Sequence, residues 1–181
     1  MTVAAFVLGL FGFGVGVASL TWQIYPFLMQ GARPKLTPIV GMVMAGGTMR
    51  VTHDATLTNA RQSLEIAAKQ FSPGPLIVGV KVVNAGRAQF HVAAWAIRAD
   101  PTGVSFNTLG EQIGSPEVPC DIPAGAEQIF FTRYEGARNL KVGADSIEDK
   151  PHRIVVTVSS GGRTFVSKPM APESLAMKDF A

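Results

Sequence analysis

The sequence predicts a mainly β protein, with one transmembrane helix at the amino terminus followed by an antiparallel β-sandwich and one or two short helices. Two observations support this prediction. All 16 Lys and Arg and all 13 Asp and Glu of the 181 residues lie at or after Arg33, so the first 32 residues carry no charged side chain. After Arg33, short runs of alternating apolar and polar residues are separated by glycine and proline turns, which is typical of strands.

The uncharged leader contains one uninterrupted apolar stretch. Residues Val3 to Trp22 include only two polar side chains, Ser19 and Thr21. At 1.5 Å per residue, a helix of this length spans roughly 30 Å, the thickness of a hydrocarbon core. We therefore predict that residues 1–32 form a membrane anchor with its juxtamembrane segment.

The residues that follow the stretch suit a membrane interface. Trp22 and Tyr25 fall where amphipathic rings prefer the headgroup level, and Arg33 and Lys35 come next. With Arg50, these basic residues are expected to contact lipid headgroups. The two charges directly after the span, with none before it, place the carboxyl-terminal domain in the cytoplasm of the cell.

Two other interpretations of the leader remain open. A cleavable signal peptide needs a basic residue before its apolar region, which this chain lacks, although residues 17–19 are small enough for cleavage. A buried helix of a soluble protein normally has a polar face, and this stretch is apolar all round. We favour a retained membrane helix over both.

The predicted helix carries a pair of glycines four residues apart, Gly12 and Gly16. Small residues at this spacing let two membrane helices approach closely. The pair therefore predicts self-association or docking against a partner's helix. The alternative is that small residues are simply common in membrane helices.

Residues 33–169 are expected to form the β-sandwich, and residues 170–181 a tail. Strand signals recur with turn residues between them, and the run 76–84 with the run 88–98 is the clearest predicted strand pair. The other predicted strands are 36–46 with 48–52, 128–133, and the closing hairpin 153–160 with 163–168.

One helix is predicted clearly and a second weakly. From Asn59 to Gln70, apolar residues fall at helical spacing on one side and charges of alternating sign four apart on the other. Asn59 is a candidate cap with Gln62 reaching back to it, and the prolines after Phe71 prevent continuation. The second candidate, around 135–142, is short and poorly patterned.

Several turn motifs carry a resemblance to known proteins. They are V-V-N-A-G-R at 82–87, a strand with a central Trp95, P-A-G at 123–125 and R-T-F-V-S-K-P at 163–169. Together with the apolar leader, this order resembles a loose group of small, membrane-anchored bacterial proteins with immunoglobulin-like domains and no assigned function. The resemblance covers most of residues 76–169 and implies an immunoglobulin-like sandwich. It carries over no catalytic or binding residue, and the single Cys120 departs from the paired cysteines of true immunoglobulin domains.

The sequence contains none of the familiar catalytic or nucleotide-binding motifs. His53, His91 and His152 are far apart, so we predict no metal site and no cofactor. His91 should share a strand face with Trp95, as a hydrogen-bonded core or edge residue. Cys120 stands beside a carboxylate, which opposes thiolate formation, so we expect an inert thiol and identify no small-molecule substrate.

Trp95 is expected to anchor the core, and two groups of residues are candidates for a partner surface. Met42 and Met44 cluster in the first predicted hairpin, and Leu175 and Phe180 lie in the tail. The alternatives are that the methionines face a core and that the tail is frayed. Acidic residues interleave with the basic ones throughout the domain, which disfavours nucleic-acid binding.

We therefore predict a single-pass protein of the cell membrane that displays a non-enzymatic binding or assembly module, an accessory component of a membrane or envelope complex. Its partners would be the lipid bilayer and a protein, or a second copy through the membrane helix. The alternative is an enzyme, or an anionic-lipid or nucleic-acid regulator, acting at the membrane surface.

Overall fold

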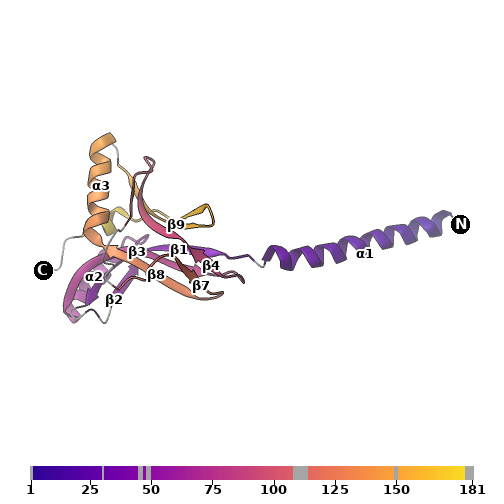
Figure 1. Cartoon of the computed structure of the whole chain (residues 1–181), viewed down its shortest axis with the longest axis horizontal. Coiled ribbons are helices and arrows are strands. Elements are labelled where there is room, and N and C mark those ends of the chain that lie inside the picture. Colours follow the sequence, from indigo (N-terminus) through magenta and orange to yellow (C-terminus); the bar gives the residue numbers. More distant parts are fainter. Residues whose placement is uncertain are drawn as a thin grey trace.

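The computed structural model consists of a long amino-terminal helix that projects from a mainly β domain (Figure 1). It describes residues 2–29, 31–44, 47, 50–107, 114–148 and 151–177, and for residues 2, 25–29 and 148 the backbone alone. The helix, α1, covers Thr2–Met29 and continues past Pro26. The missing N–H of one proline removes only one of the many backbone hydrogen bonds of so long a helix.

The strands of the described chain form two four-stranded antiparallel sheets and one two-stranded sheet. The first sheet has the order β2-β1-β3-β8, the second has the order β10-β9-β5-β6, and β4 pairs with β7. The strand bounds are β1 Pro34–Met44, β2 Arg50–Asp54, β3 Pro73–Asn84, β4 Phe90–Val92, β5 Ala94–Asp100, β6 Ser105–Phe106, β7 Cys120–Ile122, β8 Glu127–Arg133, β9 Arg153–Ser160 and β10 Arg163–Val166.

The two larger sheets share one core. Alternate residues of β1 and β3, among them Val40 and Val80, are buried in the same apolar cluster as Val156 of β9. Trp95 of β5 is 5% exposed, and its ring centroid lies 6.4 Å from that of Phe130 in β8, on the other sheet. The prediction that Trp95 anchors the core is confirmed.

The predicted pairing of 76–84 with 88–98 is wrong. The first of these runs becomes β3, which lies between β1 and β8, while the second is divided into β4 and β5, which belong to other sheets. Residues 76–80 are buried without interruption, as expected for a central strand covered on both faces. The two runs send apolar side chains into the same core from different sheets. The hairpins β1–β2 and β9–β10 pair as predicted.

The opposite face of the first sheet holds a second, smaller apolar cluster of Val43, Ile77 and Phe131. The guanidinium of Arg50 lies 5.2 Å from the centroid of the Phe131 ring, within the range of a cation–π contact. Arg50 pairs with Val43 of β1, which is ten residues after Arg33 and thus about 30 Å from it along the extended chain. The structure therefore does not bring Arg50 to the helix exit together with Arg33.

The first predicted helix is confirmed as α2, Ala60–Gln70, which buries Ala60 and Leu64. The predicted cap is wrong, because the Asn59 side chain makes no capping hydrogen bond. Asn59 has ψ near 2°, whereas a capping residue needs extended backbone to reach back to the first turn.

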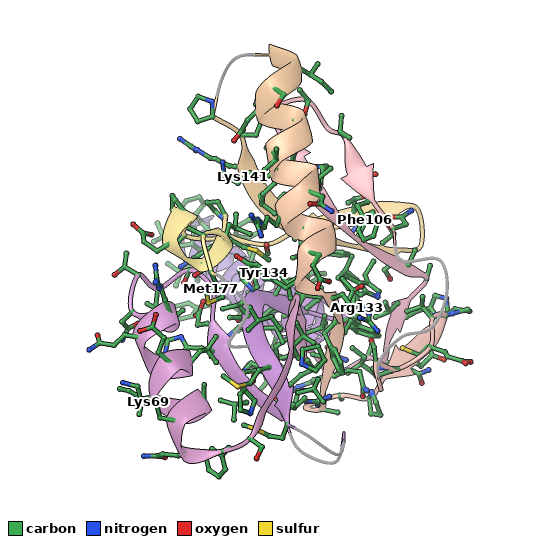
Figure 2. The ribbon with its side chains drawn as sticks, turned by 90° about the vertical axis from the view of Figure 1, so that its left-hand side faces the viewer. Lys69, Phe106, Arg133, Tyr134, Lys141 and Met177 are labelled. Carbon is green, nitrogen blue, oxygen red and sulfur yellow. The ribbon has the colours of Figure 1, made fainter. Side chains whose placement is uncertain are left out.

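The second helix is longer than predicted. This helix, α3, covers Tyr134–Glu148, directly follows β8, and stands up from the body of the domain (Figure 2). Ala137 and Ala144 are buried on one face of the helix, and Val142 is exposed on another. This pattern is that of an amphipathic helix longer than the predicted one. Phe106 of β6 covers the bare surface of Gly136, where an added Cβ would lie 2.8 Å from the ring.

The carboxyl-terminal segment is part of the domain and not a separate tail. A short helix, η1, covers Pro172–Leu175, and the side chains of Met170, Leu175 and Met177 are buried in the main core. The Tyr134 hydroxyl donates to the Ser174 carbonyl at 3.1 Å and accepts from the Met177 amide at 3.0 Å. Residues 170–177 therefore belong to the domain, and the predicted boundary between residues 169 and 170 does not separate them from it.

Candidate functional site

The largest uncovered apolar surface of the described chain is α1. Its stretch Val3–Ile24 has 22 residues, about 33 Å at 1.5 Å per residue, and none of it is buried by the domain. A membrane anchor and a signal sequence both have this length and composition. Trp22 at its end is 82% exposed, and of Tyr25 only the helical backbone is described.

Gly12 and Gly16 lie on one side of α1 with nothing within 4 Å of the point where a Cβ would stand. The other side of the helix also has small residues. Gly14 and Ala18 line a shallow apolar groove there. The structure therefore places the predicted pair on an open helix face, but small residues are not confined to that face.

The domain meets α1 at one end, which we call the basal face and define as residues 31–36, 84–89 and 122–128. Arg33 and Lys35 lie here, at the start of β1, and the turn after β3 and the loop before β8 lie beside them. Figure 1 shows these turns on the side from which α1 projects. The two predicted interface cations are thus brought to the helix exit.

Asn84 is fully buried at the centre of the basal face. Its Nδ2 donates to the carbonyl oxygens of Ala88 at 2.8 Å and Ile122 at 3.0 Å, with that of Pro123 at 3.2 Å. One side-chain amide therefore holds together the turn after β3 and the loop after β7.

The Asn84 Oδ1 accepts hydrogen bonds from the backbone amides of Arg33, at 3.3 Å, and Gly86, at 3.1 Å. The chain leaving α1 packs so closely on this turn that a Cβ added to Gly86 would lie 2.3 Å from the Gly31 carbonyl oxygen. Glycine at position 86 permits this approach. The sequence shows Asn84 and Gly86 only as turn residues, since a buried hub cannot be recognised before the partners are known.

The predicted partner surfaces are corrected by burial. Met42 and Met44 are 0% and 7% exposed and belong to the core, as alternate residues of a strand that covers it. Leu175 is 6% exposed, because η1 seats it in the same core. None of the three offers a surface in this structure, and Phe180 lies outside the described residues.

The histidines are dispersed, and the part of the chain that the structure describes has no group of three His, Cys, Asp or Glu able to hold a metal ion. His91 is exposed and its Nδ1 lies 2.7 Å from an Asp121 carboxylate oxygen. It does not share a buried face with Trp95, because the strand is interrupted at Ala93 between β4 and β5. His91 is therefore an edge residue, as predicted. The prediction that it alternates onto the same strand face as Trp95 is wrong.

Cys120 is half-buried, and both this burial and the neighbouring charge of Asp121 raise the pKa of its thiol. A raised thiol pKa lowers the fraction of reactive thiolate at neutral pH. This direction is the one expected for an inert thiol.

A charged cluster that sequence reasoning missed joins α3 to β9. The Asp145 carboxylate accepts a hydrogen bond from the Lys141 ammonium, one from the His152 backbone amide at 2.7 Å, and lies 3.2 Å from the His152 Nδ1. These bonds, the one from Lys141 first, lower the pKa of Asp145 to about 2. Only the i to i+4 spacing of Lys141 and Asp145 signals this cluster in the sequence.

A small cavity of about 210 Å³ adjoins this cluster. Lys141, His152 and Arg153 line it together with apolar residues of β9 and the carboxyl-terminal segment. Among the described residues that line it there is no carboxylate, thiol or hydroxyl group.

Comparison with protein-family models, curated proteins and solved structures gives no match to this chain. The resemblance to membrane-anchored proteins with immunoglobulin-like domains therefore stays a prediction.

The Asp145 cluster makes stability depend on pH in a defined direction. The folded-state pKa of about 2 lies below the ordinary value of 3.8. The carboxylate therefore contributes stability above the ordinary pKa, and this contribution is lost as the pH falls from about 4 to about 2. We predict that Asp145→Asn unfolds more easily than wild type at neutral pH and that the difference shrinks over this range, measured by denaturant unfolding of the full chain in detergent. Equal differences at both ends of the range would contradict the assigned role.

Proposed function

We propose that the chain is a single-pass membrane protein that presents its β domain as a non-enzymatic binding or assembly module at the membrane surface. One observation carries the proposal. The apolar stretch Val3–Ile24 is uncovered on all sides, and the domain offers it no contact that would hide it from water. Burial of apolar surface stabilises at about 25 cal/mol per Å², so such a helix needs lipid or another helix around it.

The chain that leaves α1 is packed against the base of the domain. Arg33, four residues beyond the helix end at Met29, is already hydrogen-bonded to Asn84. Close packing of Gly86 on Gly31 extends this contact toward the helix. Because these residues lie after the candidate cleavage site at 17–19, the contacts fix where α1 leaves the domain and are the same for a retained and a cleaved helix.

The chemistry of the described residues supports binding over catalysis. The Cys120 thiol has a raised pKa, and the Asp145 carboxylate is engaged in an ion pair that joins two elements. A raised thiol pKa disfavours thiolate chemistry, and the Asp145 carboxylate holds α3 to the start of β9. An enzyme at the membrane surface is the alternative.

We propose further that the two larger sheets form an immunoglobulin-like sandwich. Their shared core and the contact of Trp95 with Phe130 between sheets support a two-layer arrangement. The basic residues that directly follow α1 support a cytoplasmic position for the domain.

The anchor is tested by alkaline carbonate extraction of membranes from cells that express the full chain, with amino-terminal sequencing of the mature protein. We expect the chain to stay in the membrane pellet with the apolar stretch retained. Leu10→Arg should weaken retention, because a charge at mid-span costs about 2.5–3.5 kcal/mol, whereas Leu57→Arg on the domain surface should not. A freely soluble chain, or a mature protein beginning near Leu20, would refute the proposal.

Association through the helix is tested by a membrane self-association assay of the full chain. If Gly12 and Gly16 form the contact, replacing both with leucine should sharply reduce association, because the helices can no longer approach closely. The matched control replaces Gly14 and Ala18 with leucine, on the other side of α1, and should leave association near the wild-type level. Unchanged association in the Gly12 and Gly16 variant would rule out this contact between helices.

A further inference from the structure

We propose that the basal face of the domain is a docking surface for anionic lipid headgroups, formed by Lys35, Arg87 and Arg33 together. This inference rests on the proposed membrane anchor and adds to it a defined lipid partner and a defined orientation of the domain. Arg87 is the new member, because it is far from the helix in sequence and reaches the helix exit only through the fold.

The position of Arg87 follows from backbone contacts and not from its own side chain. Its neighbour Gly86 packs on Gly31, and the Ala85 amide donates to the Arg33 carbonyl oxygen at 3.0 Å. The turn that carries Arg87 is therefore held against the segment that leaves α1. If α1 spans a bilayer, this turn lies beside the point where the helix emerges.

The charges of the basal face are strongly unbalanced. In its three segments, 31–36, 84–89 and 122–128, the acidic residue Glu127 stands against three basic ones. Lys35 and Glu127 lie opposite Val83 on the two strands that flank β3. The three segments therefore carry two more basic than acidic side chains.

The cations are also available for an external partner. Lys35 and Arg87 are exposed, and neither forms an ion pair with a carboxylate of the described residues. Lys35 lies two residues beyond Arg33, about 7 Å along the strand, which is within one Debye length at physiological salt. All three charges can therefore act on the same headgroup layer.

The chemistry of the face favours a lipid surface over an apolar partner. Its exposed residues between the charges are small or polar, such as Ala85, Ala88, Gln89 and Ala124, and none is a large exposed hydrophobic group. A surface of small and polar residues without large apolar side chains lies against headgroups and does not insert into hydrocarbon. Each basic side chain near an anionic surface favours the contact by about fivefold, and the effect weakens with salt.

The test places the full chain in lipid nanodiscs of neutral phosphatidylcholine, with or without anionic phosphatidylglycerol. A fluorophore is attached at Gln89→Cys in a Cys120→Ser background, and its quenching by a headgroup-linked quencher is measured. We expect stronger quenching in the anionic discs, lost at high salt. Arg87→Glu should reduce it several-fold, while Arg138→Glu, the same charge reversal on the exposed face of α3, should leave it unchanged.

The outcomes separate the two proposals. Quenching that is equal in neutral and anionic discs, or equally affected by Arg87→Glu and Arg138→Glu, overturns the lipid-docking surface while the anchor stands. A chain that does not enter nanodiscs at all overturns both. Circular dichroism of each variant confirms that the comparison is made on folded protein.

Discussion

The buried side-chain amide of Asn84 is the interaction on which the arrangement of anchor and domain depends. It donates to carbonyl groups of two loops and accepts from the amide of Arg33, the residue just before the first strand. A buried amide left without partners costs about 1–3 kcal/mol, so every group around it is constrained to stay in place. The same interaction closes the base of the core and fixes where the helix leaves it.

This constraint connects the two halves of the chain physically. Because the Arg33 segment packs on the turn at Gly86, the end of the domain nearest α1 is set by backbone contacts and not by a loose linker. At the other end, α3 and the carboxyl-terminal segment close the core through Tyr134 (Figure 2). An anchored chain would thus present α2 and α3 away from the bilayer and the basal face toward it.

The sequence predicted the elements better than their partners. The apolar leader, α2, and the β1–β2 and β9–β10 hairpins follow from local periodicity and turn chemistry. The pairing of β3, the burial of Met42 and the docking of Leu175 do not, because they depend on which apolar faces meet across the core. The site could be predicted in part: Arg33 and Lys35 follow the span directly, whereas Arg87 and Asn84 join them only through long-range contacts.

The most direct measurement is hydrogen exchange of the full chain in nanodiscs, comparing wild type with Asn84→Ala. The account predicts faster exchange at the amides of Arg33 and Gly86, which lose their acceptor, and a free energy of unfolding lowered by roughly 3 kcal/mol. Exchange in α3, at the far end of the domain, should change only as much as global stability does. Unaltered exchange at Arg33 and Gly86 with wild-type stability would contradict the claim that Asn84 ties the helix exit to the domain.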